Sequence, residues 1–342
     1  MATLKEIAEM ANVSLGTVDR VIHNRGRVAA ETAARVRRIV EQVNYRPNIL
    51  ARSLSSAKTF HFGILVPFPE QDGNYWYLPR QGIDRAAEEL QVYKVEIEYF
   101  PYDKYDENSF AAAAQQVLKN IHQIDGLLIA PVLSKAAEKF ITQLPKRLAY
   151  IFLDSYIPKS HCLSYIGEDS FQSGLLAAKL MSLLTHDGKS AVIKAIPFNY
   201  HIEDRVRGYL SYFESRPSAE VLVFEASSQD SCSFQNAAAQ ILEHHPEIKG
   251  IFCSNACSFQ VAKAVYASRR RISLVGYDLV KENIEWLEKG VIDFLISQRS
   301  EIQGYNALYR LYRAVALKEK IEPALYVPLD IVTKENLRYY QN

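Results

Sequence analysis

Residues 59–342 alternate short apolar runs with amphipathic stretches. The apolar runs predict strands at 60–67, 92–100, 126–131, 149–154, 190–196, 220–226, 250–254, 272–277 and 291–296. Helical spacing of apolar residues follows most of these runs, at 79–90, 107–123, 169–184, 203–214, 233–244 and 300–318. Strands that alternate with helices in this way predict parallel sheets with helices on both faces, and so many strands require two sheets.

We therefore expect residues 59–342 to form an α/β core of two doubly wound parallel-sheet subdomains. The first is placed at about 59–162 plus 297–325, and the second at about 163–296 plus 326–342. The segment "SYIGEDSFQSG" at 164–174 is interpreted as the connection between them.

Residues 1–58 show a different pattern, with three short stretches of helical spacing. Thr3 followed by Glu6 has the sequence of a capping box, and Ser14 is a suitable cap for the second helix. Only two residues separate the first helix from that cap, which is the spacing of a helix-turn-helix. Their apolar faces, which can share one small core, are Leu4, Ile7 and Met10; Val18, Val21 and Ile22; and Ala33, Val36, Val40 and Val43. The sequence thus predicts a small all-α domain ahead of the α/β core.

The charge of the chain is unevenly distributed between these two parts. Residues 1–58 carry ten Lys and Arg against five Asp and Glu, a net charge of +5, whereas the remainder carries −4. A basic head on a mildly acidic body suggests a nucleic-acid contact confined to the head, although a solvated surface would look the same.

Composition narrows the class of protein. The chain has 342 residues, of which 48% are hydrophobic, and its start has neither an apolar run nor a cleavage signal, so we expect a cytoplasmic protein without a membrane span. Four cysteines do not make a disulfide framework. Cys253 and Cys257 are interpreted as small buried residues rather than metal ligands, and neither a metal nor a cofactor is expected.

The second helix of the head carries the candidate DNA contacts. With its valines facing inward, its outer residues can reach a major groove. Arg20 can present a bidentate fork to guanine, and Ser14, Thr17 and Asn24 can bond phosphate oxygens. Leu15 and Gly16 complete the outer surface. The alternative is a three-helix module that binds protein.

The stretches "TLKEIAEMANVSLGTVDRVIHNRGRV" and "NYRPNILARSL" make the head resemble that of the LacI/GalR family of bacterial transcription regulators. The resemblance implies a hinge helix at about 46–56 that forms on operator DNA, where Asn48 can act as a helix cap. It also implies that Leu54 wedges into the minor groove. By itself this segment is too short to form a stable helix.

Asp19 departs from the family pattern, which commonly has serine at this position. A carboxylate near a phosphate is repulsive unless it is paired. Asp19 could pair with His23, accept a hydrogen bond from cytosine or lie along the rim of the DNA backbone, and the sequence does not choose among these.

The predicted core places polar residues where ligands bind in a doubly wound sheet, at the carboxyl ends of strands. The core resembles the ribose-type periplasmic binding fold, and this resemblance implies an effector site at Tyr75, Trp76, Asp154, Arg205, Asn255, Asp278 and Gln298. A second acidic contact is in doubt, because Ala256 stands where the family often has aspartate. Arg205 could instead be an exposed helix residue, Asp278 a helix cap and Trp76 a packing residue.

No sequence motif of the common enzyme classes occurs, so we expect no enzymatic activity. We interpret the chain as a homodimeric transcription regulator, most simply a repressor, that binds a pseudo-palindromic operator and a small polar effector such as a sugar. The alternatives are a solute-binding protein without a regulatory role and a nucleobase-responsive regulator of the same fold.

Overall fold

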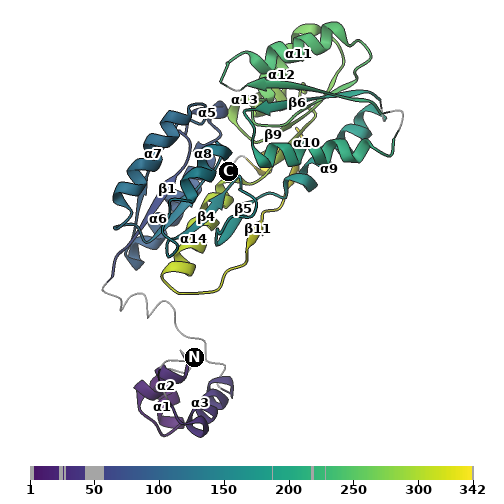
Figure 1. Cartoon of the computed structure of the whole chain (residues 1–342). Helices are drawn as coiled ribbons and strands as arrows, with labels where there is room; N and C mark the ends of the chain where they lie inside the picture. Colours follow the sequence, from purple (N-terminus) through teal and green to yellow (C-terminus); the bar gives the residue numbers. More distant parts are fainter. Residues whose placement is uncertain are drawn as a thin grey trace. The chain divides into compact units, whose positions relative to one another are not determined.

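The computed structural model describes residues 4–22, 26, 28–42, 58–186, 188–216, 219–227 and 229–340. The chain divides into two compact units, Met1–Ser56 and Ala57–Asn342 (Figure 1). Each unit has its own hydrophobic core.

The first unit contains the three expected helices, α1 (Leu4–Met10), α2 (Leu15–Ile22) and α3 (Ala30–Gln42). Ser14 caps α2, because its Oγ accepts a hydrogen bond from the Thr17 amide at 3.2 Å. The buried core of this unit consists of Ile7, Ala8, Ala11, Val18, Val21, Val36 and Ile39. Met10 was expected on the inner face of α1 but is 56% exposed, and the smaller Ala8 and Ala11 fill the helix crossing instead.

The second unit contains two six-stranded sheets, each the centre of one lobe (Figure 1). The first sheet is wholly parallel, in the order β11 (Ala324–Tyr326), β5 (Ser164–Gly167), β4 (Ala149–Leu153), β3 (Gly126–Ile129), β1 (Phe60–Leu65) and β2 (Val95–Tyr99). The second has the order β12 (Asp330–Val332), β10 (Phe294–Ser297), β9 (Ser273–Tyr277), β8 (Gly250–Cys253), β6 (Ser190–Ile196) and β7 (Val221–Ser227). Only β12 runs antiparallel to its neighbour.

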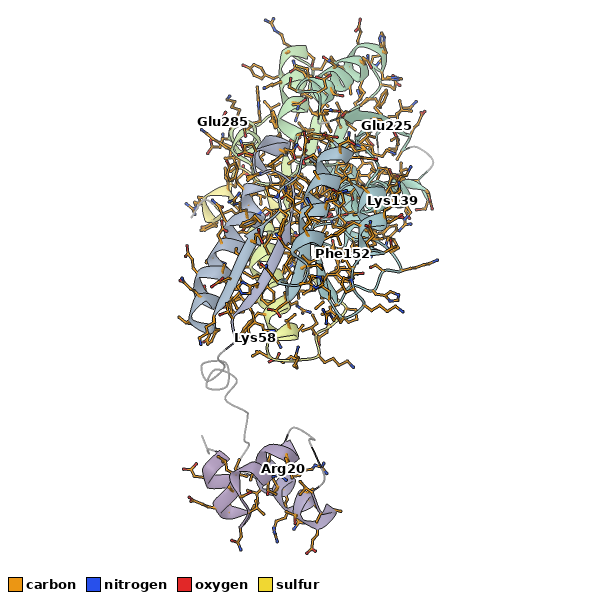
Figure 2. The ribbon with its side chains drawn as sticks, turned by 60° about the vertical axis from the view of Figure 1, so that its left-hand side comes forward. Arg20, Lys58, Lys139, Phe152, Glu225 and Glu285 are labelled. Atoms are coloured by element: carbon orange, nitrogen blue, oxygen red, sulfur yellow. The ribbon has the colours of Figure 1, made fainter. Side chains whose placement is uncertain are left out.

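Helices cover both faces of each sheet. On the first sheet, α6 (Tyr77–Leu90) and α14 (Ser300–Val315) pack on one face, and α7 (Glu107–Asn120) and α8 (Ser134–Ile141) on the other. On the second, α9 (Ser170–Thr185) and α10 (Tyr200–Phe213) lie opposite α11 (Ser233–His244), α12 (Ser258–Ser268) and α13 (Lys281–Glu288). Large side chains such as Phe152 fill these layers (Figure 2). The short elements are α5 (Gln71–Asn74), η1 (Gln91–Tyr93) and η2 (Leu337–Tyr339).

The structure corrects the expected position of the first crossing between lobes. Strand β5 lies inside the segment interpreted as a connection and pairs with β4, so the first lobe extends beyond residue 162. The chain crosses between β5 and α9, returns between β10 and α14, and crosses again between β11 and β12. These three connections bring the carboxyl ends of the two sheets together.

Within the described ranges, no helix is both long and apolar enough to cross a bilayer.

Candidate functional site: a pocket between the two lobes

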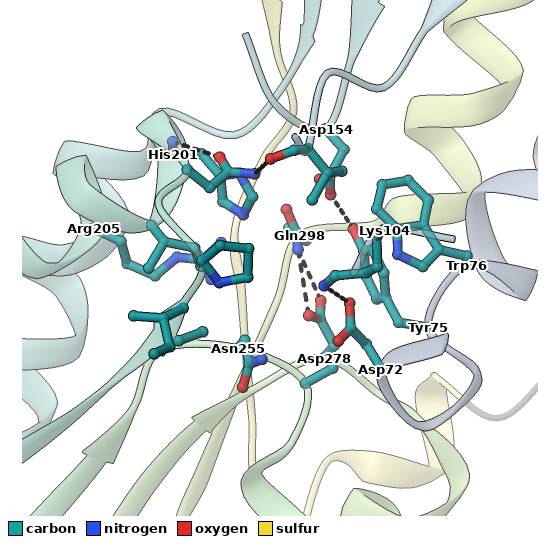
Figure 3. Close-up of a pocket in the computed structure, with 17 residues that line it drawn as sticks. Asp72, Tyr75, Trp76, Lys104, Asp154, His201, Arg205, Asn255, Asp278 and Gln298 are labelled. Carbon is teal, nitrogen blue, oxygen red and sulfur yellow. Dashed lines mark hydrogen bonds and ion pairs between the residues drawn. The ribbon is translucent and has the colours of Figure 1, made fainter. Parts of the chain in front are cut away.

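A pocket, partly open to solvent, lies where the carboxyl ends of the two sheets meet (Figure 3). All seven residues expected at an effector site line it: Tyr75, Trp76, Asp154, Arg205, Asn255, Asp278 and Gln298.

Two aspartates occupy equivalent places in the two lobes. Asp154 follows β4 and Asp278 follows β9, and each has a left-handed backbone with φ 66°. Each backbone N–H donates to a carbonyl of the neighbouring strand segment, Ile166 for Asp154 and Ile296 for Asp278. The sharp turn that follows directs both carboxyl groups into the pocket (Figure 3).

Neighbouring side chains donate hydrogen bonds to both carboxyl groups. The Tyr75 hydroxyl donates to Asp154 and accepts from Ser300 Oγ at 3.1 Å. Gln298 Nε2 lies 3.1 and 3.3 Å from the two carboxyl oxygens of Asp278. Gln298 is itself held by Gln303, whose amide donates to its backbone carbonyl at 2.7 Å. These contacts fix both aspartates before a ligand arrives.

Burial controls the protonation of this pair. Removal from water raises the pKa of Asp154 to about 6, while the hydrogen bond from Tyr75 and the charge of Arg205 act against this rise. Burial likewise raises the pKa of Asp278 to about 8, again opposed by Arg205. The pocket therefore holds two carboxyl groups that are readily protonated near neutral pH.

Arg205 is almost fully buried, with 1% of its surface exposed, so the alternative of an exposed helix residue is wrong. Its Nε lies 2.9 Å from Glu168 Oε1, its terminal nitrogens donate to Glu168 and to the Ser254 carbonyl, and its guanidinium stacks 3.7 Å from the centre of the Tyr277 ring. Burial by itself would lower the pKa of Arg205, but the charge of Glu168 raises it above its usual value.

Two glycines at a helix crossing place α10, and with it Arg205, close to α9. A Cβ atom on Gly174 would lie 1.9 Å from the Arg205 carbonyl oxygen, and one on Gly208 would lie 2.1 Å from that of Phe171. Only glycine permits this approach of the two backbones.

The sequence analysis missed four polar residues of the pocket: Asp72, Lys104, Asn199 and His201. Lys104 forms an ion pair with Asp72, which also accepts from the Tyr105 hydroxyl at 2.7 Å. Lys104 follows the end of β2, so the strand-end rule could have found it. His201 lies one helical turn before Arg205, on the same face of α10.

Two buried nitrogens of the pocket lack a hydrogen-bond partner among the described residues, namely Trp76 Nε1 and His201 Nδ1. Burial, with the charges of Arg205 and Lys104, lowers the pKa of His201 well below its usual value, so its imidazole is neutral. Because an unpaired buried polar group is costly, both atoms are suited to a ligand or to ordered water.

The aromatic residues of the pocket both pack and line it. Trp76 is 3% exposed and stands edge-on to Tyr75, with ring centres 5.2 Å apart. Trp76 also belongs to a hydrophobic cluster with Ala256 and Val280 of the other lobe. The packing role and the pocket-lining role are therefore compatible.

Asn255 lies just after β8 and shapes the turn there. Its Oδ1 accepts from the Cys257 amide at 3.1 Å. As expected, Cys253 and Cys257 are buried thiols. In the described part of the chain, no cluster of three or more His, Cys, Asp or Glu side chains could hold a metal ion.

The head presents part of the expected DNA-contacting set on its surface. Ser14, Leu15, Gly16 and Arg20 are exposed and Thr17 is partly buried; Arg20 is visible on the surface in Figure 2. The Thr17 hydroxyl lies 2.9 Å from Ser14 Oγ, and a Cβ on Gly16 would lie 3.9 Å from an Arg20 terminal nitrogen. Asn24, Asn48, Leu54 and the hinge segment at 46–56 lie outside the described residues.

A helix-turn-helix unit joined to a two-lobed core with a polar pocket defines a DNA-binding regulator with a ligand-sensing part. Comparisons with known proteins agree: residues 62–320 match the periplasmic binding protein domain, and residues 3–48 match the bacterial regulatory proteins of the lacI family. The chain belongs to the lacI family of bacterial regulatory proteins, with a sensor core of the periplasmic binding protein type.

Individual proteins are also similar to this chain. The ribose operon repressor of Bacillus subtilis is 27% identical over 362 aligned positions, which cover 99% of each chain. Catabolite control protein A of Streptococcus mutans is 27% identical over 239 positions, covering 69% of this chain and 68% of that relative. The crystal structure of a Bacteroides fragilis protein assigned as a LacI transcriptional regulator has a TM-score of 0.77 and 28% identity, over 83% of this chain and 100% of that one.

Proposed function

We propose that this regulator is a homodimeric cytoplasmic repressor without enzymatic activity, whose affinity for its operator is set by a neutral monosaccharide or similar polyol. The observation that carries the proposal is the convergence of Asp154 and Asp278, one from each lobe, on a single buried pocket. Carboxylates accept hydrogen bonds from adjacent hydroxyls, which are the groups that a sugar offers.

The charges of the pocket favour a neutral ligand over an anionic one. Arg205 is paired with Glu168, and Lys104 is paired with Asp72. A sugar acid or a phosphorylated sugar would have to compete with the Glu168 and Asp72 carboxylates for these two cations. The names of the relatives as ribose operon repressors further support a sugar.

Direct contacts between the lobes suggest how the ligand could act. Ser155 Oγ donates to Asn199 Oδ1 at 2.7 Å, and Asn199 Nδ2 donates to the Val132 carbonyl at 3.2 Å. The Tyr200 hydroxyl donates to Glu138 at 2.9 Å. A ligand that bridges the two aspartates adds to these contacts and favours the arrangement of the lobes described here. The ligand can change the affinity for the operator only to the extent that it binds one arrangement of the two lobes more tightly than another.

We further propose that Ser14, Leu15, Gly16, Thr17, Arg20 and Asn24 contact operator DNA in the major groove, and that Asn48 and Leu54 act in a hinge at the minor groove. Two heads are needed for a pseudo-palindromic operator, which supports the homodimer.

A thermal-shift screen of the purified chain against pentoses, hexoses, polyols, sugar acids and nucleobases tests the ligand class. A specific ligand at about 100 times its Kd should stabilise the core by roughly 3 kcal/mol. We expect a neutral sugar or polyol to raise Tm. A response to nucleobases alone, or to sugar acids alone, would contradict the proposal.

A further inference from the structure

Of the described residues that line the effector pocket, Arg205 and Lys104 carry a positive charge, and each forms an ion pair. The two pairs differ in the position of the acid. Glu168, the partner of Arg205, has a fully buried side chain and is not among the lining residues. Asp72, the partner of Lys104, lines the pocket itself, and Figure 3 shows both side chains of this pair directed into it. A ligand therefore meets the charges of Lys104 and Asp72 together.

The guanidinium of Arg205 is already committed to contacts within the protein. Its Nε and one terminal nitrogen donate to Glu168, and the other terminal nitrogen donates to the Ser254 carbonyl. The guanidinium also stacks on the Tyr277 ring. Lys104, in contrast, is a compact charge on a flexible stem, which can turn to a new partner. Lys104 is thus the cation of the pocket that a change in its acidic partner could make available to a ligand.

The local backbone and two side chains hold Asp72 beside Lys104. Asp72 and Gly73 have left-handed backbones, with φ 54° and 67°, so the chain turns sharply within α5. The Tyr105 hydroxyl donates to Asp72 Oδ1 at 2.7 Å. Gln71 joins the two segments, because its Oε1 accepts from the Lys104 amide at 3.0 Å. The ion pair is therefore built into the wall of the pocket.

Burial strengthens this pair and carries its effect into the pocket. The side chains of Lys104 and Asp72 are 11% and 8% exposed, so the water that weakens surface ion pairs is largely excluded. The charge of Lys104 also acts on a neighbour: burial, the charge of Arg205 and then that of Lys104 lower the pKa of His201. An anion in the pocket would be attracted to Lys104 in the same way if Asp72 did not neutralise it.

We propose that Asp72 determines whether the effector is neutral or anionic. By neutralising Lys104 it makes the pocket selective for neutral sugars and polyols, an inference that rests on the proposed function of this pocket. Without the charge of Asp72, the Lys104 ammonium can donate to a carboxylate of the ligand. The pocket then accepts sugar acids, because Asp154 and Asp278 still offer acceptors to the hydroxyls.

Calorimetric titration of the full chain at about pH 5.5, where sugar acids are ionised, tests the proposal. The probes are D-ribose, D-glucose and D-galactose, with D-ribonate, D-glucuronate and D-galacturonate as the matching acids. Asp72→Asn removes the charge, suits the left-handed backbone and can still accept from Tyr105. Asp106→Asn is the matched control, because Asp106 is exposed, lies two residues from Lys104 and caps α7, which Asn can also do.

Asp72→Gly is a second uncharged variant that suits the same backbone, and thermal melting verifies that each variant is folded. In Asp72→Asn at least one sugar acid should bind roughly tenfold more tightly than in wild type, while the neutral sugars change less. Asp106→Asn should behave like wild type. Addition of Lys104→Met to Asp72→Asn should abolish the gain.

The proposal would be overturned if neither uncharged variant at residue 72 gains affinity for an acid. An equal gain in Asp106→Asn, or a gain that survives Lys104→Met, would overturn it as well. If wild type itself prefers the acids, the proposed neutral effector is wrong, whereas the role of Asp72 is still decided by the difference between wild type and Asp72→Asn.

Discussion

Replacing Asp278 by Asn should stabilise the unliganded protein at neutral pH. Asn has nearly the shape of a protonated Asp, tolerates the left-handed backbone at this position, and can still accept a hydrogen bond from Gln298 Nε2. The substitution therefore removes the titration of this group while it preserves the geometry of the turn.

The size of this stabilisation follows from the raised pKa of Asp278, which is about 8 in the folded protein against 3.8 in the unfolded chain. Between these values the folded state holds a proton that the unfolded state has released, so stability falls as pH rises from about 4 to about 8. The loss is ~1.4 kcal/mol per pH unit, which gives roughly 3 kcal/mol between pH 5 and pH 7. The stability of Asp278→Asn relative to wild type should rise by this amount over the same interval.

Urea unfolding at pH 5, 6 and 7 measures the difference. Both tryptophans of the chain, Trp76 and Trp286, lie in the two-lobed core, so their fluorescence reports its unfolding. Asp154 is present in both proteins, and its own pH dependence largely cancels in the comparison. If the two proteins differ by a constant amount at all three pH values, Asp278 does not carry a raised pKa and the electrostatic description of the pocket is wrong.

Three further predictions concern DNA binding and the contacts that hold the two lobes together. Arg20→Ala should lose about 1–3 kcal/mol of operator binding but little binding to random DNA; equal losses in fluorescence anisotropy would make Arg20 only a phosphate contact. Leu54→Ala should reduce DNA bending in circular-permutation gel assays, and unchanged mobility would argue against a minor-groove wedge. Asn199→Ala should weaken effector binding, because Ser155 and the Val132 carbonyl lose their partner in the other lobe; unchanged affinity by calorimetry would show that these contacts do not favour closure.

Periodicity in the sequence predicted most of the fold but missed its shortest strands. Strands β11 and β12 have only three residues each and are partly exposed, so neither length nor alternation distinguishes them from loops. Strand β5 has four residues, as the predicted strands β3, β8 and β10 do, so its length does not explain why it was missed. Strand β5 forms because β4 and β11 flank it, and β11 comes from a distant part of the chain. The error in the first lobe boundary has this origin.

The sequence predicted those residues of the pocket that follow the ends of strands. It missed residues whose place in the pocket depends on an ion pair with another side chain. The seven expected residues converge because parallel strands end at one edge of each sheet. Lys104 enters the pocket through its ion pair with Asp72, and Glu168 becomes important only through Arg205. Neither pairing has a fixed spacing in the sequence, so only the folded chain shows it.

Operator binding in the presence and absence of the effector tests the central claim most directly. The operator is selected from random DNA, the ligand comes from the thermal-shift screen, and wild type is compared with Asp278→Ala, which removes the polar atoms of this side chain from the pocket. We expect the ligand to change the operator affinity of wild type, while the variant binds the operator like unliganded wild type and responds little to the ligand. A full ligand-dependent change in the variant would contradict the assignment of the pocket between the lobes as the sensor.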